Sequence, residues 1–237
     1  MEKIRLDKFL SNAKVLSRKE TAIAIKRQEI TINDKIATKK EQLVGAEDVI
    51  KYNGNIVTYE KYVYIMLNKT AGYVSSTDDP RDQTVLDLLP DHYKKYDLFP
   101  CGRLDKDTVG LVILTNNGIA THKLLSPKNH VEKTYYFELA ESITNDKIKV
   151  IENGILLADG YVTKPCKVSM TTETSGHITL TEGKYHEIKR MFGASNNKIT
   201  YLKRISFDKI LLDQNLKEGE YRLLNDQEKQ VFEQFES

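Results

Sequence analysis

Apolar and polar positions alternate over short distances in residues 1–58, and the pattern predicts two helices followed by a small hairpin. An apolar face at helical spacing opens the chain, formed by Ile4, Leu6, Phe9 and Leu10. Ser17, with Glu20 three positions later, forms a capping box that predicts a second helix over residues 18–27. Residues 30–37 read as two short strands around a polar two-residue turn. This segment is therefore expected to be a small α+β module.

Strand patterns dominate from residue 59 onward. The predicted strands cover residues 62–67, 110–115, 134–139, 168–170, 177–181, 200–207 and 221–224. The predicted helices cover residues 84–89, 119–125, 145–152 and 187–192, with Gly193 ending the fourth, and a last one after the Asn225/Glu228 cap. The fold class is therefore α+β. A small domain over 1–58 is followed by a mixed, mainly antiparallel-sheet domain over 59–237.

Composition indicates where in the cell the protein works more clearly than what it does. The 237 residues include 36 Lys and Arg against 34 Asp and Glu, so any nucleic-acid binding must come from local clusters. Cys101 and Cys166 are too few for a disulfide framework and fit no zinc spacing, which favours a reducing cytoplasm. The charged first ten residues lack a secretory pattern, and no apolar run is long enough for a membrane span. We expect a soluble, cytoplasmic protein.

Residues 102–111, Gly-Arg-Leu-Asp-Lys-Asp-Thr-Val-Gly-Leu, are the most specific candidate for chemistry. Two glycines bracket a charged loop that leads into an apolar strand, so the scaffold can hold a carboxylate of the loop toward a cleft. From spacing alone, however, Asp105 is more simply an aspartate in a solvated turn beside Lys106. A hydrolase using Asp105 and Asp107 as paired carboxylates is a further alternative that the loop leaves open.

Several blocks in order make the chain resemble the ribosomal-RNA pseudouridine synthases. The blocks are Leu-Asn-Lys-Thr-Ala-Gly at 67–72, Gly-Arg-Leu-Asp at 102–105, Leu-Thr-Asn-Asn-Gly at 114–118, Leu-Ser-Pro at 125–127, Val-Glu-Lys-Thr-Tyr at 131–135 and Glu-Gly-Lys-Tyr-His-Glu-Ile-Lys-Arg-Met at 182–191. Thr70 stands where that family usually has proline, and Glu187 where it usually has glutamine. An ordered series of blocks is far more specific than any one of them.

The resemblance implies a role for each matched residue. Asp105 is the nucleophile, Tyr135 lies against the uracil face, and Lys189 is the cation that keeps Asp105 ionised. The residues expected to bind substrate are Arg103, Ile188, Lys106 and Arg190. The five histidines are read as surface or structural, and neither a cofactor nor a metal is expected. Whether Asp105 attacks C1′ or C6 stays open.

The first segment resembles the small RNA-binding domain shared with a ribosomal small-subunit protein. Its matching residues are Arg-Leu-Asp-Lys-Phe-Leu at 5–10, Ser-Arg-Lys-Glu at 17–20 and Ile-Thr-Ile-Asn at 30–33. The basic side chains expected to contact RNA are Arg5, Lys8, Lys14, Arg18, Lys19, Lys26 and Arg27. The alternative is that these are ordinary charges on solvated helix faces.

The combined resemblance implies an enzyme of ribosome biogenesis. Nothing in the sequence indicates a stable homo-oligomer, so we expect a monomer. It would isomerise one uridine to pseudouridine, most plausibly in small-subunit ribosomal RNA, either free or within an assembling particle. The N-terminal domain and the lack of a long basic tail favour the small-subunit branch over the large-subunit one. A catalytically silent RNA-binding assembly protein is the remaining alternative, although it would not require Asp105, Tyr135 and Lys189 together.

Overall fold

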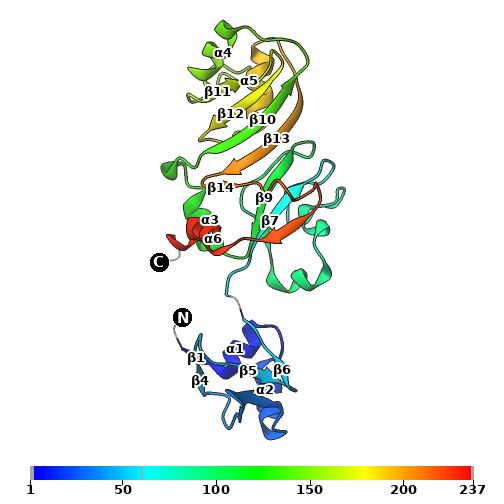
Figure 1. The fold of residues 1–237 in the computed structure, drawn as a ribbon, viewed down its shortest axis with the longest axis vertical. Coiled ribbons are helices and arrows are strands. Elements are labelled where there is room, and N and C mark those ends of the chain that lie inside the picture. The colour runs from blue at the N-terminus through cyan, green and yellow to red at the C-terminus, as the bar shows by residue number, and fades with distance from the viewer. Residues whose placement is uncertain (1–2, 60, 236–237) are drawn as a thin grey trace. The chain divides into compact units, whose positions relative to one another are not determined.

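A computed structural model describes residues 3–59 and 61–235 of the chain. The chain divides into two compact units, Met1–Tyr62 and Val63–Ser237 (Figure 1). Both units combine helices with sheet, so the predicted α+β class is confirmed. Across the described ranges, no helix is both long and apolar enough to span a bilayer.

The smaller unit packs two helices against a four-stranded sheet. Its elements are β1 Ile4–Arg5, α1 Leu6–Asn12, α2 Arg18–Lys26, β2 Ile30–Ile32, β3 Lys35–Ile36, β4 Leu43–Val44, β5 Ile50–Tyr52 and β6 Asn55–Ile56. The predicted capping box begins α2, with Glu20 N donating to Ser17 Oγ at 3.3 Å and Ser17 N to Glu20 Oε2 at 2.7 Å. Asn33 and Asp34 both adopt positive φ in the tight turn between β2 and β3. The predicted helices and hairpin are therefore present.

A nine-stranded sheet forms the larger unit, and seven of its strands follow the order β11-β12-β10-β13-β9-β7-β15. Their bounds are β7 Tyr64–Lys69, β9 Val109–Thr115, β10 Lys133–Leu139, β11 Lys167–Met170, β12 Ser175–Leu180, β13 Ile199–Phe207 and β15 Tyr221–Leu223. Two short strands, β8 Phe99–Pro100 and β14 Ile210–Leu211, pair at the side of this path. Within the described residues β9 and β13 pair in parallel and the other pairs are antiparallel, as the predicted sheet type requires.

Short helices flank the sheet. They are η1 Val85–Leu88, η2 Asp91–Tyr96, α3 Gly118–Leu124, η3 Pro127–Asn129, α4 Asn145–Glu152, α5 Glu187–Ala194 and α6 Asp226–Glu233. The Asn225/Glu228 capping box begins α6, as predicted. Gly193 does not end the helix that starts at Glu187, so that prediction was wrong. Gly193 lies inside α5 and Ser195 is the C-cap, because Met191 and Phe192 bury the last turn in the core.

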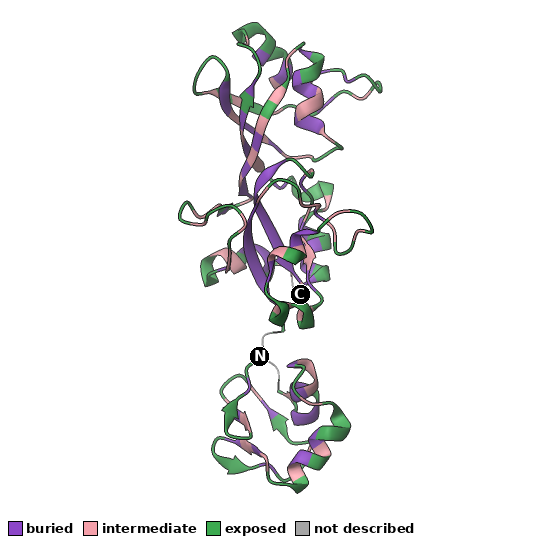
Figure 2. Ribbon diagram, turned by 90° about the vertical axis from the view of Figure 1, so that its right-hand side faces the viewer, coloured by how far each residue is buried: buried purple, intermediate pink, exposed green. Residues whose placement is uncertain are grey.

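Strands β7 and β9 are buried along their whole length at the centre of the larger unit (Figure 2). Where β9 meets β13 the two backbones approach so closely that a Cβ at Gly110 would collide with the carbonyl oxygen of Arg204. Gly110 also has a φ of +98°, which favours glycine. The second glycine of the 102–111 loop is therefore needed to seat β9 against β13, directly after Asp105.

Candidate active site

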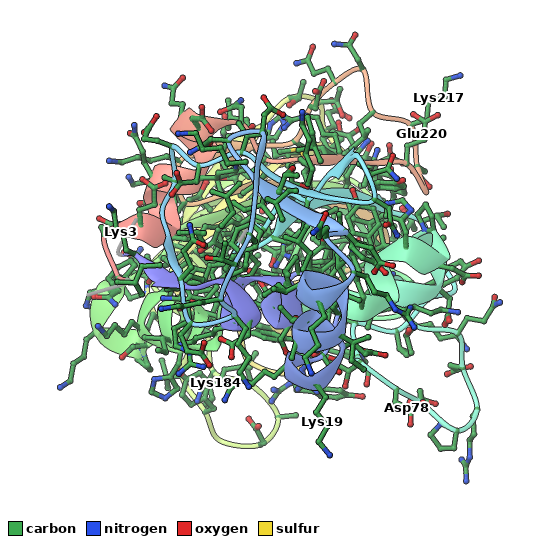
Figure 3. The ribbon with its side chains drawn as sticks, turned by 90° about the horizontal axis from the view of Figure 1, so that it is seen from below. Lys3, Lys19, Asp78, Lys184, Lys217 and Glu220 are labelled. Atoms are coloured by element: carbon green, nitrogen blue, oxygen red, sulfur yellow. The ribbon has the colours of Figure 1, made fainter. Side chains whose placement is uncertain are left out.

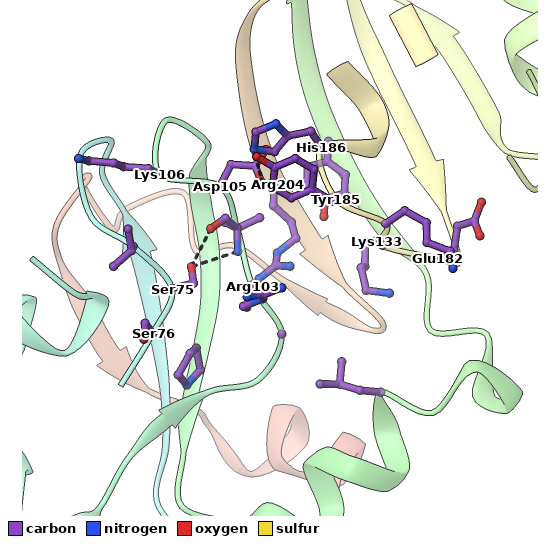
Figure 4. A pocket seen from close by; sticks show the side chains of 18 of the residues that line it. Ser75, Ser76, Arg103, Asp105, Lys106, Lys133, Glu182, Tyr185, His186 and Arg204 are labelled. Atoms are coloured by element: carbon purple, nitrogen blue, oxygen red, sulfur yellow. Dashed lines mark hydrogen bonds and ion pairs between the residues drawn. The ribbon is translucent and has the colours of Figure 1, made fainter. Parts of the chain in front are cut away.

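A cavity of about 960 Å³ lies beside the loop that carries Asp105 (Figure 4). Its walls come from separate segments that include residues 74–79, the loop 100–106, the start of β10, and residues 181–186 before α5. Residues 125–127 and 161–164 contribute further side chains. Arg204 of β13 also lines it. A loop carboxylate therefore faces a cavity formed by segments far apart in the sequence, which is how a rigid scaffold presents a reactive group.

The residues before and after Asp105 are fixed by two polar side chains. Ser75 Oγ accepts a hydrogen bond from Leu104 N at 3.0 Å and donates to Leu104 O at 3.1 Å (Figure 4). Lys69 is fully buried, and its Nζ donates to the carbonyl oxygens of Thr70, Lys106 and Thr108 at 2.8–3.1 Å. Burial lowers the pKa of Lys69 to about 8. The sequence assigned no role to Ser75 and only a place in the 67–72 block to Lys69, although both hold the loop in one conformation.

Asp105 is paired with Lys189, whose Nζ donates to Asp105 Oδ2 at 3.0 Å. The same ammonium donates to Asp107 Oδ1 at 2.5 Å. Burial disfavours the charge on Lys189, but the two carboxylates outweigh burial and raise its pKa. His186, one of the five histidines interpreted as surface or structural, has its Nε2 3.5 Å from Asp105 Oδ1. The structure thus surrounds Asp105 with cationic or polar partners.

Tyr135 and Ile188, predicted to contact the uracil face and to form an apolar wall, line one cavity together. A smaller cavity of about 80 Å³ is lined by Asp105, Tyr135, Ile188 and Lys189 together. The Tyr135 side chain is buried and belongs to the main core, while it also lines the larger cavity. Arg103 lines the smaller cavity too, so four of the predicted residues are gathered around Asp105.

The other predicted substrate-binding residues divide into two groups. Arg103 and Lys106 are exposed and line the larger cavity, where Lys106 Nζ pairs with Asp82 Oδ1 at 2.5 Å. Arg190 lines neither cavity. Its guanidinium pairs with Asp159 Oδ2 at 2.5 Å and donates to Tyr185 O at 3.3 Å. The structure therefore brings Arg103 and Lys106 to the site, but not Arg190.

The predicted RNA-contacting residues all have exposed side chains in the smaller unit: Arg5, Lys8, Lys14, Arg18, Lys19, Lys26 and Arg27. Lys19 extends away from the ribbon (Figure 3). Arg5 makes a two-point ion pair with the buried carboxylate of Asp7, with distances of 3.0 and 2.8 Å. Arg5 therefore supports the fold of the smaller unit in addition to being exposed.

A pair of carboxyl groups lies at the start of α5. Glu187 is 5% exposed, its Oε2 accepts from Lys184 N at 2.9 Å, and its carboxyl hydrogen-bonds that of Glu182. Burial, followed by this contact, raises the pKa of Glu187 to about 8. Glu182 Oε2 accepts from Tyr161 Oη at 2.6 Å and keeps a lowered pKa despite partial burial. Burial and the contact with Glu182 therefore favour the protonated form of Glu187, which can donate a hydrogen bond as the amide of a glutamine would.

Comparison with known proteins gives the same assignment for both units. A family model described as RNA pseudouridylate synthase matches residues 63–194, and the S4 domain model matches residues 4–50. Among solved structures, a crystal structure of pseudouridylate synthase aligns with a TM-score of 0.69 and 36% identity. It covers 97% of this chain and 99% of the other.

Curated relatives also match along nearly the whole chain. An uncharacterised RNA pseudouridine synthase of Bacillus subtilis is 43% identical over 231 residues, covering 95% of this chain and 96% of its own. The ribosomal small subunit pseudouridine synthase A of Escherichia coli is 37% identical over 227 residues, covering 95% and 98%. The protein of that name from Vibrio cholerae is 38% identical over 226 residues, covering 95% and 97%.

Proposed function

The chain belongs to the RNA pseudouridylate synthase family, and we propose from this premise that it isomerises one uridine of small-subunit ribosomal RNA, with Asp105 as nucleophile. The observation that carries the assignment of Asp105 is its position: it faces the cavity while Lys189 donates to its carboxylate at 3.0 Å. A neighbouring cation favours the ionised, nucleophilic form of an aspartate.

The reaction requires no net change in atoms. The N1–C1′ bond breaks, the uracil turns, and a C5–C1′ bond forms; the hydrogen of C5 is released and N1 ends with a hydrogen. Asp105 attacks the nucleotide and departs again as a carboxylate at the end of the reaction, and Lys189 orients that carboxylate before attack and stabilises it on departure. Ser75 and Lys69 hold the loop, so Asp105 does not have to be ordered when substrate arrives.

The walls of the site have roles in holding the base. Tyr135 stacks on the uracil and Ile188 supplies an apolar wall, because both lie with Asp105 around the smaller cavity. A uridine inside folded RNA must first leave its stack, at a cost of a few kcal/mol. Arg103, exposed beside the nucleophile, fills the vacated position or holds a flanking phosphate, and Lys106 lies at the same rim.

The small-subunit target is proposed from the relatives. Several relatives whose alignments cover 95% of the chain are named as ribosomal small subunit pseudouridine synthases. Residues 1–58 act as the RNA-binding domain and residues 59–237 as the catalytic domain. A ribosomal RNA substrate, free or in an assembling particle, implies that the protein acts in the cytoplasm, where we expect it to be a monomer.

A hydrolase with paired Asp105 and Asp107 carboxylates fits the geometry less well. A glycosidase needs one carboxylic acid with a raised pKa to protonate the leaving group. Lys189 instead outweighs partial burial and lowers the pKa of Asp107, whose side chain is 74% exposed. A silent RNA-binding protein is also disfavoured, because such a protein needs no nucleophile paired with a cation in a cavity.

Release of the C5 hydrogen tests the proposal directly. Small-subunit ribosomal RNA transcribed with uridine tritiated at C5 is incubated with the full chain, and tritium in water is counted. The expected result is release of one tritium per RNA molecule, without free uracil. Free uracil would indicate hydrolysis. No release from free or partly assembled small-subunit RNA would overturn the proposed target.

A further inference from the structure

A β-bulge beside Tyr135 places two cations on one face of the sheet. Lys133 pairs with Phe207 and Tyr135 with Arg204, and the register shifts between these pairs. In an unbroken strand, Arg204 and Phe207 would point to opposite faces because they are three residues apart. The extra residue of the bulge instead turns the Arg204 side chain to the face that carries Phe207. Bulges next to active sites often redirect a side chain in this way.

Both cations lie near the same aromatic ring. Arg204 Cζ is 5.5 Å and Lys133 Nζ 5.8 Å from the ring centroid of Phe207. Both residues also line the larger cavity, where Arg204 and Lys133 are seen beside Arg103 (Figure 4). The bulge therefore concentrates positive charge in the part of the cavity next to Tyr135.

No carboxylate of the described residues forms an ion pair with either cation. Arg204 is 1% exposed; its Nε donates to Leu111 O at 2.6 Å, and its Nη2 is buried without a partner among the residues described. Lys133 Nζ donates to Val131 O at 3.0 Å and keeps two further donors. Burying a cation without a counter-ion is costly, so this arrangement needs a compensating anion.

The titratable groups that face Lys133 do not provide this anion. They are Arg204, which repels it, and the side chains of Glu187 and Cys101. Burial raises the pKa of Glu187 to about 8 and that of the Cys101 thiol to about 11, which disfavours the anionic form of both. Their attraction for Lys133 is weaker than burial and the repulsion from Arg204. Burial, followed by repulsion from Arg204, lowers the pKa of Lys133 to about 8.

We propose that Lys133 and Arg204 form a subsite for an RNA phosphate group, the one attached to the uridine held against Tyr135, and this assignment rests on the proposed function. The ligand class is a phosphate ester, since a guanidinium with an ammonium matches several phosphate oxygens at once. A bound phosphate compensates both cations and stabilises the protonated form of Lys133. The subsite thus orients the nucleotide through its backbone while Tyr135 holds its base.

The test compares uridine with uridine 5′-monophosphate and uridine 3′-monophosphate, titrated into the full chain and followed by NMR or calorimetry. One of the two monophosphates is expected to bind about tenfold more tightly than uridine at pH 7. In Lys133→Met this advantage is expected to fall below twofold. Lys149→Met, which removes an exposed lysine on α4, is the matched control and should keep the full advantage.

The pH dependence provides a second, independent readout. The phosphate advantage of the wild type should fall between pH 7 and pH 9 as Lys133 loses its proton in the free protein. Lys133→Arg should keep it, because a guanidinium stays charged. Arg204→Lys should reduce the advantage at pH 7. Thermal melting of this variant and the wild type checks that the variant is folded.

Two results would overturn the subsite: monophosphates that bind no more tightly than uridine, or an advantage that survives Lys133→Met. Both readouts measure binding and do not depend on isomerisation. A chain that keeps the phosphate advantage yet makes no pseudouridine would overturn the proposed function alone. A chain that makes pseudouridine without the advantage would overturn only the subsite.

Discussion

Lys189 and Asp105 are 84 positions apart in the sequence, yet the ammonium of Lys189 donates to Asp105 Oδ2 at 3.0 Å. The pair joins the loop before β9 to the first turn of α5. Partial burial of Lys189, with 22% of its side chain exposed, strengthens the interaction over that of a surface ion pair. This contact therefore sets the position of the nucleophile relative to its neighbouring cation.

Removing the charge of Lys189 should impair catalysis without unfolding the chain. Lys189→Met is expected to lower kcat/KM by about 100-fold, the equivalent of about 2.7 kcal/mol of transition-state stabilisation. Lys189→Arg should recover part of the loss because it retains a cation. Asp107→Asn serves as control, since the Lys189–Asp105 contact remains, and should stay within a few-fold of wild type. If Lys189→Met were as active as wild type, the proposed role of Lys189 would be wrong.

The aromatic ring of Tyr135, rather than its hydroxyl, should provide its contribution to substrate binding. Tyr135→Phe keeps the stacking face and should retain most activity, whereas Tyr135→Leu should lower kcat/KM by about 10- to 100-fold, in line with about 1–3 kcal/mol per stacked base. Single-turnover assays with matched thermal melts separate this loss from a packing defect in the core. Equal losses in both variants would assign the role to the hydroxyl instead.

Glu187 should make stability depend on pH in a defined direction. The folded chain keeps the Glu187 proton up to about pH 8, whereas the unfolded chain releases it near the ordinary value of 4.5. The free energy of unfolding therefore falls as pH rises between these values. Glu187→Gln keeps a donor toward Glu182 but has no proton to lose.

Urea unfolding at pH 5.5, 7 and 8.5 measures this effect. The decrease from pH 5.5 to pH 8.5 should be smaller in Glu187→Gln than in wild type by about 2 kcal/mol. Groups that titrate in both proteins cancel in the comparison. Parallel curves for the two proteins would show that Glu187 is ionised in the folded chain at neutral pH.

The basic side chains of helix α2 and its C-cap should contribute to RNA affinity and not to turnover. Replacing Arg18, Lys19, Lys26 and Arg27 with glutamine is expected to raise KM for RNA and to reduce the salt dependence of binding by up to about three charges. Turnover at saturating RNA should not change. Lys35→Gln with Lys39→Gln, which alters other exposed lysines of the same unit, is the control. A lower kcat with unchanged KM would contradict a recruiting role.

Local sequence signals predicted much of the fold. The Ser17/Glu20 and Asn225/Glu228 capping boxes marked real helix starts, because the signal and its hydrogen bonds lie within four residues. Short strands such as β1 and β4 were missed, since two-residue strands exist only through pairing between Ile4 and Val44. Gly193 was misread because tertiary burial of the last turn of α5 outweighed the local glycine signal.

The candidate site shows the same difference between residues with a local sequence signal and residues placed only by tertiary structure. Asp105, Tyr135 and Lys189 came from sequence blocks, and the structure brings them to adjoining cavity walls. Arg204 carried no local signal, because only a bulge in β13 turns it toward the cavity. The approach of His186 to Asp105 depends on how residues 181–186 fold, which the spacing of the five histidines does not indicate.

Site-by-site mapping of pseudouridine tests the assignment of Asp105 and of the target RNA in one experiment. Small-subunit and large-subunit ribosomal RNA, free and partly assembled, would be incubated with the wild type and with Asp105→Asn. We predict one new pseudouridine in small-subunit RNA with the wild type and none with Asp105→Asn. A pseudouridine formed equally by both proteins would contradict the assignment of Asp105, and none in any RNA would contradict the proposed enzyme activity.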